Sequence, residues 1–288
     1  MKFIADLQIH SKYSRAVSKD MVLEELDRWA DDKGILVMGT GDFTHPAWFA
    51  EIKEKLEPAE PGLFKLKRQY KQQTMKGTLA ETRFMLTAET SHIYSRGGKT
   101  RRVHLLIFSP SLEVAEKFNI QLGLVGNLKS DGRPILGLDS EELLKLALNV
   151  SPEMVVIPAH AWTPWFSVFG SMSGFDSLDE CFGEYTKYIF AIETGLSSNP
   201  QMNWRLSKLD NLSIVSNSDS HSLEKIGREA NCFDCHLLYQ GIVEAIKSRD
   251  PKKFLYTIEF FPEEGKYHYD GHRVCGVCFS PKESKKHN

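Results

Sequence analysis

Residues 3–11 read FIADLQIHS, and this short stretch is the first indication of the fold. The apolar residues at its odd-numbered positions alternate with Asp6, Gln8 and His10. Because strand side chains alternate between two faces, the pattern predicts a β-strand with these three polar groups on one face. A packed core would not select an acid, an amide and an imidazole together. The strand is therefore expected to lead into a functional site.

Strand-like and helix-like runs alternate beyond this stretch. Strands are predicted over 154–160, 188–194 and 212–218, and helices over 139–149 and 242–248. Repeated strand–helix units favour a parallel α/β sheet, and this many favour a barrel. After Phe261 the chain becomes rich in glycine, lysine, histidine and tyrosine. We therefore expect a main domain over 1–261 and a tail over 262–288.

The overall composition limits the class of protein. A chain of 288 residues that is 41% hydrophobic can form one large barrel-type domain with a small appendage. The net charge of −2 gives no general attraction to nucleic acid, so a DNA partner would need local positive charge. No apolar run is long enough to span a membrane, and the first residues do not form a signal-peptide pattern. Five cysteines without disulfide-type spacing fit a reducing compartment, so a cytoplasmic, nucleoid-associated location is expected.

Residues of the types that bind metals recur near the predicted strand ends. They are Asp6, Gln8, His10, Asp42, His45, Glu89, His92, His104, His160, Glu193, Asp219 and His221. The strand ends of a parallel barrel face one side, so these groups can converge. Mixed imidazoles and carboxylates suit Zn, Mn or Fe, and about eight ligands would hold two or three ions. A single histidine is more often structural, and His92 and His236 are interpreted so; the coincidence of five others at strands favours a site.

The motifs DLQIHS, TGDFTH, VH, PAH and SDSH, in this order, resemble the PHP superfamily (polymerase and histidinol phosphatase). Longer segments, such as HSKYSRAVSKDM and IETGLSSNPQMNWRLS, are similar to the endonuclease Q family within it. The resemblance implies a distorted (β/α)7 TIM-like barrel with a trinuclear metal site. It also implies an endonuclease that cleaves DNA phosphodiester bonds next to deaminated or damaged bases. The implied partners are DNA with deaminated bases and replication or repair proteins.

The resemblance assigns a role to each matching residue. The implied metal ligands are His10, Asp42, His45, Glu89, His104, His160, Asp219 and His221. His10, Glu89 and Asp219 are the expected catalytic residues, acting with Zn, Mn or Fe, or with Mg in activity. The family pattern begins with His-x-His, whereas this chain has Gln8 in the first position, and an amide oxygen is a weaker zinc ligand. Asp6 is expected to orient the site rather than to bind an ion.

The tail contains a pair of cysteines. Cys275 and Cys278 form CGVC, one half of a four-cysteine zinc site, and the family would continue into a second pair. We expect a zinc-ribbon-like remnant in a shortened chain, or a site completed by His268 or His272. Cys232 and Cys235 also have this spacing, but they lie in a predicted strand, where such positions face opposite ways.

Two basic segments and one aromatic loop could contact DNA. The turn SRGGKTRR contains Lys99, Arg101 and Arg102 without an acid, and residues 64–76 interleave basic and aromatic side chains. The loop 162–175 follows the strand of His160 and is rich in aromatic residues. An enzyme that recognises a damaged base usually extrudes it into such a pocket, so Phe169 and Ser171 are expected to read the base. The alternative is ordinary packing beneath a long loop.

Two other functions remain open. The chain could be a PHP phosphoesterase for a small phosphorylated metabolite. It could also be a non-catalytic, truncated DNA-binding remnant, because Gln8 replaces a histidine and the second cysteine pair is absent.

Overall fold

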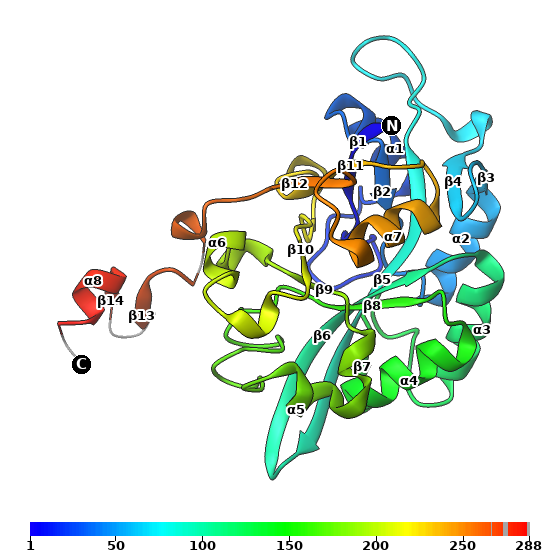
Figure 1. The fold of residues 1–288 in the computed structure, drawn as a ribbon. Helices are drawn as coiled ribbons and strands as arrows, with labels where there is room; N and C mark the ends of the chain where they lie inside the picture. Colours follow the sequence, from blue (N-terminus) through cyan, green and yellow to red (C-terminus); the bar gives the residue numbers. More distant parts are fainter. Residues whose placement is uncertain (266, 273–275, 287–288) are drawn as a thin grey trace.

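The computed structural model describes residues 1–265, 267–272 and 276–286, without the side chains of 270–272 (Figure 1). A ten-stranded mixed sheet forms the centre of the molecule. Neighbouring strands along it are β12 (Phe254–Ile258), β11 (Ala230–Asp234), β1 (Lys2–Asp6), β2 (Val37–Gly39), β5 (Arg83–Arg96), β6 (Lys99–Ser109) and β8 (Val155–Pro158). Two further strands pair with β5, namely β4 (Leu63–Leu66) and β7 (Ile135–Leu136). β3 (Leu56–Pro58) pairs with β4. β9 (Ala191–Glu193) and β10 (Ser213–Val215) form a separate parallel pair.

Helices and loops surround these strands (Figure 1). The helices are α1 (Leu23–Asp32), α2 (Pro46–Lys55), α3 (Leu112–Gly123), α4 (Ser140–Val150), α5 (Leu178–Phe182), α6 (Pro200–Asn203), α7 (Tyr239–Ser248) and α8 (Pro281–Ser284). Ser111 and Asp139 cap α3 and α4 with side-chain oxygens that accept backbone N–H bonds. Within the described chain, no helix is long and apolar enough to cross a bilayer.

The strands do not close into the distorted (β/α)7 barrel that we expected. β10 lies beside β1 and β11, but side chains replace the backbone ladder there. Asn231 Oδ1 accepts from Ser216 N at 3.0 Å, and Asn217 Oδ1 accepts from Leu7 N at 2.8 Å. A buried amide side chain thus satisfies backbone groups that a paired strand would otherwise satisfy. The fold is a mixed α/β structure with open sheets.

The hairpin of β5 and β6 departs most from a parallel barrel. The two strands pair antiparallel over their whole length around the glycine-containing turn 97–98, and β6 also pairs antiparallel with β8. The end of the hairpin that carries the turn projects from the body of the molecule (Figure 1). A parallel arrangement predicts His104 at the C-terminal end of a strand, and this prediction is wrong. His104 lies at the middle of β6, opposite Ser91 of β5.

The tail lies to one side of the main body (Figure 1). It contains a short antiparallel pair, β13 (Asp270–His272) and β14 (Val277–Phe279), followed by α8. Cys278 is an exposed free thiol on β14, whereas Cys275 lies outside the described residues. The structure therefore does not test the expected zinc-ribbon remnant.

A buried acid beneath the 67–82 segment leads to a pH prediction. Asp27 of α1 is fully buried, neither of its carboxylate oxygens has a hydrogen-bond partner, and Lys71 Nζ lies 4.0 Å away. Burial raises the pKa of Asp27 from 3.8 to about 7, against the opposing charge of Lys71. Between pH 5 and pH 8 the folded carboxyl loses its proton, whereas the unfolded carboxyl is ionised throughout. This group therefore contributes less to stability as the pH rises.

We expect Asp27→Asn to remove this pH dependence. Relative to the parent chain, the unfolding free energy of the variant should rise by about 2 kcal/mol between pH 5 and pH 8. Urea unfolding at the two pH values measures the change. An equal pH dependence in both proteins would show that Asp27 keeps an ordinary pKa.

Candidate metal centre

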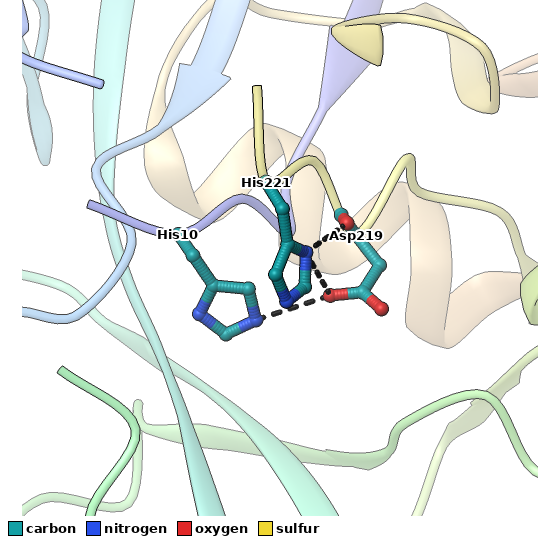
Figure 2. Close-up of side chains that lie close together, drawn as sticks. All are labelled: His10, Asp219 and His221. Carbon is teal, nitrogen blue, oxygen red and sulfur yellow. Dashed lines mark hydrogen bonds and ion pairs between the residues drawn. The ribbon is translucent and has the colours of Figure 1, made fainter. Parts of the chain in front are cut away.

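His10, Asp219 and His221 form one group of facing side chains (Figure 2). His10 Nε2 lies 3.0 Å from Asp219 Oδ1, and the rings of His10 and His221 meet edge to face with centroids 4.7 Å apart. His221 Nδ1 lies 2.8 Å from the backbone oxygen of Asp219. His10 follows β1, and the other two residues follow β10, so segments more than 200 residues apart meet here. The backbone link is a hydrogen bond from His10 N to Ser220 O.

Glu89 lies at the centre of a second group with His104 and His160. Its Oε1 atom is 2.5 Å from His104 Nδ1 and 3.4 Å from His160 Nε2. Its Oε2 atom is 2.9 Å from His10 Nε2, which joins the second group to the first. One carboxylate thus faces imidazoles from three different strands or strand ends, as a ligand shared between two ions would.

Asp42 extends the site beyond these two groups. It is fully buried, and its Oδ1 atom lies 3.1 Å from His10 Nδ1. Its Oδ2 atom accepts hydrogen bonds from the Ser11 hydroxyl at 2.6 Å and from the Ser14 hydroxyl at 2.8 Å. His45 follows in the same loop, but its Nδ1 caps α2 at Trp48 N. His45 is therefore near the centre but outside both groups, and only its Nε2 is free of this capping role.

Three of these residues have unusual backbone conformations. Asp42, His160 and Asp219 have φ angles of 47°, 29° and 46°, in the left-handed region that non-glycine residues rarely occupy. Each lies in the loop just past β2, β8 or β10. Such conformations cost about 1–3 kcal/mol and concentrate where a side chain must take a functional direction. The loops after the strands are thus shaped to turn these side chains toward the cluster.

Buried carboxylates outside the cluster hold these loops in place. Asp6 accepts from Ser218 N at 3.0 Å and from Gly227 N at 2.9 Å, and so it fixes the backbone that leads to Asp219. Glu193 accepts from His160 N at 2.8 Å and from the Asn217 amide at 2.7 Å. Asp6 thus contacts backbone next to an expected ligand rather than another ligand side chain.

The donor set fits bound divalent cations. Burial acts to raise the pKa of Glu89, but Arg133 and His104 outweigh it and hold this pKa well below its usual range. The carboxylate therefore stays charged in a buried position, which favours positive charge beside it. Gln8 Nε2 donates to Glu89 Oε2 at 2.9 Å, whereas the buried Gln8 Oε1 has no hydrogen-bond partner. An orphaned amide oxygen in a ring of imidazoles and carboxylates is a suitable ligand for a cation.

Sequence reasoning missed Arg133. This residue follows Gly132 in the loop before β7, and its Nη1 atom lies 3.4 Å from Glu89 Oε2. No strand pattern identifies it, because it lies on a loop. The only signal was the turn dipeptide Asp131–Gly132 followed by Pro134, which predicts a tight connection but no function.

The expected DNA-binding residues of the hairpin occupy different environments. Lys99 is exposed at the turn. Arg101 packs on the Phe175 ring at 4.1 Å and donates to Gly174 O, so its guanidinium is already engaged. Arg102 lies over the Trp165 ring at 5.0 Å. The two arginines thus attach the aromatic loop to the hairpin, and Trp165, which is 42% exposed, presents a stacking surface there.

The aromatic loop borders the cluster, as expected. His104 N donates to Phe166 O, and the two rings pack with centroids 4.7 Å apart. Phe169 packs against Trp162 and is partly buried, whereas Ser171 is exposed. Phe169 therefore supports the loop from within, and Ser171 is the more accessible of the two predicted base-reading residues.

Comparison with known proteins places these features among relatives. No protein-family model matches the chain. It is 28% identical to the protein YqxK of Bacillus subtilis over 96% of its own length and 70% of YqxK. It is 31% identical to the protein MJ0043 of Methanocaldococcus jannaschii over 55% of this chain and 16% of that protein.

Solved structures give a closer functional comparison. The lesion-specific endonuclease PfuEndoQ of Pyrococcus furiosus superimposes with a TM-score of 0.82 at 29% identity, over 99% of this chain and 66% of its own. An endonuclease Q bound to a 27-mer duplex with an abasic lesion at its active site gives a TM-score of 0.83 at 29% identity, over 99% of this chain and 67% of its own. The chain thus spans about two thirds of these solved chains. A protein of Bifidobacterium adolescentis assigned as a metal-dependent phosphoesterase shares the fold alone, with a TM-score of 0.50 at 13% identity over 75% of this chain and 87% of its own. The chain therefore resembles endonuclease Q over nearly its whole length, and it shares its fold with this phosphoesterase.

Proposed function

We propose that this chain is a metal-dependent endonuclease that cleaves DNA phosphodiester bonds next to deaminated or damaged bases. The observation that carries the proposal is the convergence of His10, Asp219 and His221 with Glu89, His104 and His160. This convergence occurs in a chain that aligns over 99% of its length with endonuclease Q. The fold alone would equally suit a phosphoesterase for small metabolites, so it is the resemblance to endonuclease Q that supports DNA as the substrate.

The residues of both groups would hold two or three divalent ions, with Zn, Mn or Fe preferred by their mixed nitrogen and oxygen donors. Asp42, His45 and the Gln8 amide oxygen would complete the ligand set. Bound ions supply Lewis acidity and activate water near neutral pH. The two Glu89 oxygens contact the imidazoles of His10, His104 and His160. The hydroxyls of Ser11 and Ser14 donate to Asp42 Oδ2 and so hold that carboxylate in one orientation. Asp219 is 27% exposed on its side chain, so it lies where the cluster meets solvent and substrate.

The DNA would approach along the hairpin and the aromatic loop. A solved endonuclease Q complex contains duplex DNA, which supports a DNA partner for this chain. Lys99 is free to neutralise a backbone phosphate, and the exposed Trp165, held by Arg102, can stack on a base. These contacts lie on the side of the cluster formed by His104 and His160.

A nicking assay tests the proposal. Duplexes of one sequence would carry a single uracil, a single hypoxanthine or no lesion, and the protein would be supplied with Mn or Zn. We expect strand cleavage only in the lesion-containing duplexes. Hydrolysis of free phosphomonoesters without any nicking would instead identify a metabolite phosphoesterase. The absence of all hydrolysis by a metal-loaded sample would identify a non-catalytic protein.

The exposed serine of the aromatic loop should affect lesion preference. Ser171→Ala removes a hydroxyl that can bond a base edge, and a net hydrogen bond is worth about 1 kcal/mol. We expect the ratio of cleavage rates for uracil and hypoxanthine duplexes to change about fivefold. Met172→Ala is the matched control, because Met172 is the exposed neighbour and offers no strong hydrogen-bonding group. Equal ratios in the parent chain and in Ser171→Ala would remove Ser171 from base recognition.

Phe169→Ala should act differently, because Phe169 supports the loop by packing on Trp162. It should slow cleavage of both lesions together, and the same assay separates this effect from a change in preference.

A further inference from the structure

We propose that Arg133 binds the phosphate group of the substrate beside the metal ligands. The inference rests on the proposed phosphodiester cleavage and names the side chain that would hold the anion. A DNA backbone and a smaller phosphate ester both present a phosphate oxyanion, and this is the group that Arg133 would bind. Arginine suits this role because its planar fork of N–H groups matches two phosphate oxygens.

The backbone on both sides of Arg133 is fixed. Gly132 N donates to Tyr13 O at 3.1 Å, and Pro134 O accepts from Ser91 N at 3.0 Å. Gly132 also packs so closely on the site that a Cβ atom there would lie 2.3 Å from both Asp42 Oδ2 and Ser14 Oγ. A larger residue would push the Asp42 carboxylate or the Ser14 hydroxyl aside, so glycine lets the chain bring the next residue directly to the cluster. The backbone at Arg133 is therefore held in place before any ligand binds, which lowers the entropic cost of binding.

The guanidinium uses only part of its bonding capacity. Its Nη1 atom lies 3.4 Å and 3.5 Å from the two Glu89 oxygens, which are long distances for charged hydrogen bonds. Nε and Nη2 make no hydrogen bond to any residue of the described chain, and neither is among its fully buried, unpartnered polar atoms. The side chain is 25% exposed. A guanidinium with free N–H groups thus borders the cluster and still reaches solvent.

The charges around the Arg133 guanidinium explain why it would bind the substrate phosphate rather than Glu89 once metal ions are present. Glu89, Asp219 and Asp42 all attract the guanidinium electrostatically. All three are expected ligands, so bound cations would neutralise the carboxylates that now attract Arg133. The same cations would repel the guanidinium, and an anion that touches both the ions and Arg133 would relieve this repulsion. A phosphate bound at the metals is such an anion.

The competing role is that of a counter-ion, in which Arg133 only balances the charge of Glu89. The two roles predict different losses. A phosphate-binding arginine can be removed without loss of metal, whereas removal of a counter-ion would alter metal content or stability without a specific effect on phosphate.

Isothermal titration calorimetry with inorganic phosphate tests the proposal on the metal-loaded chain. The variants are Arg133→Gln and Arg133→Lys, with Arg205→Gln as a control at an exposed arginine in the loop after α6. Metal content and melting temperature are measured on the same samples, together with hydrolysis of bis(4-nitrophenyl) phosphate. We expect Arg133→Gln to bind phosphate at least about tenfold more weakly, because a charge-assisted hydrogen bond is worth about 1.5–3 kcal/mol. Arg133→Lys should be intermediate, and Arg205→Gln should match the parent.

The proposal is overturned if Arg133→Gln binds phosphate like the parent, if the parent binds no phosphate, or if Arg133→Gln loses its metal. A parent chain that nicks no DNA, but whose phosphate affinity and ester hydrolysis fall in Arg133→Gln, would refute the endonuclease function and leave this inference standing.

Discussion

The Asp219→Asn variant is expected to cleave lesion-containing DNA at least about a thousandfold more slowly than the parent chain. Asp219 faces His10 and His221 at the solvent-accessible edge of the cluster. Replacing its carboxylate with an amide removes one negative charge from the expected cation site and retains the shape of the side chain. A loss of about 4 kcal/mol of stabilisation corresponds to the thousandfold change in rate.

Asparagine is the informative replacement because of the backbone. Asp219 has a φ of 46°, and asparagine tolerates this left-handed conformation better than alanine does. The variant should therefore melt within a few degrees of the parent, and its lost activity cannot be attributed to unfolding. Asp210→Asn, an exposed change of the same type, serves as the control. Cleavage by Asp219→Asn at more than about one tenth of the parent rate would show that Asp219 does not serve the reaction.

The second large effect concerns stability in the presence of metal. Added Mn or Zn should raise the melting temperature of the chelator-treated parent by about 5–10 °C per tightly bound ion. At a hundredfold excess over Kd a ligand contributes about 2.7 kcal/mol, and each kcal/mol shifts a chain of this size by about 2–4 °C. Glu89→Gln should lose most of this shift, because Glu89 faces His10, His104 and His160 together.

Differential scanning calorimetry with titrated metal measures the shift. Glu113→Gln is the control, because the side chain of Glu113 is 76% exposed on α3 and belongs to neither group of facing side chains. An undiminished shift in Glu89→Gln would mean that the added ions bind elsewhere. Such a result would leave the nicking prediction to be decided independently.

Much of the local structure could be predicted from the sequence, because short patterns determined it. The alternation around Asp6 and His10 predicted β1, and the strand predicted over 154–160 contains β8. The helix predicted over 139–149 coincides with α4 to within one residue at each end. Of the residues predicted near strand ends, the structure brings together His10, Asp42, Glu89, His104, His160, Asp219 and His221, whereas His45 lies outside both groups.

The remaining features depend on contacts that no local pattern encodes. Where the sheets stay open, the side chains of Asn217 and Asn231 accept from backbone N–H groups of Leu7 and Ser216, which are distant in sequence. The antiparallel course of β6 puts His104 within a strand rather than at its end. His45 and Arg101 have the expected residue types, but capping of α2 and packing on Phe175 already engage them. Arg133 reaches the site from a loop, where periodicity gives no information.

The most direct measurement is elemental analysis of the purified chain by mass spectrometry, before and after incubation with Mn and Zn, on samples that are also tested for nicking. The account predicts two or three divalent ions per chain and cleavage of uracil- or hypoxanthine-containing duplexes. It also predicts that Glu89→Gln and Asp219→Asn hold fewer ions than the parent. A parent chain that retains less than one ion after incubation, or that binds the same number as both variants, would contradict the claim that these side chains form a metal centre.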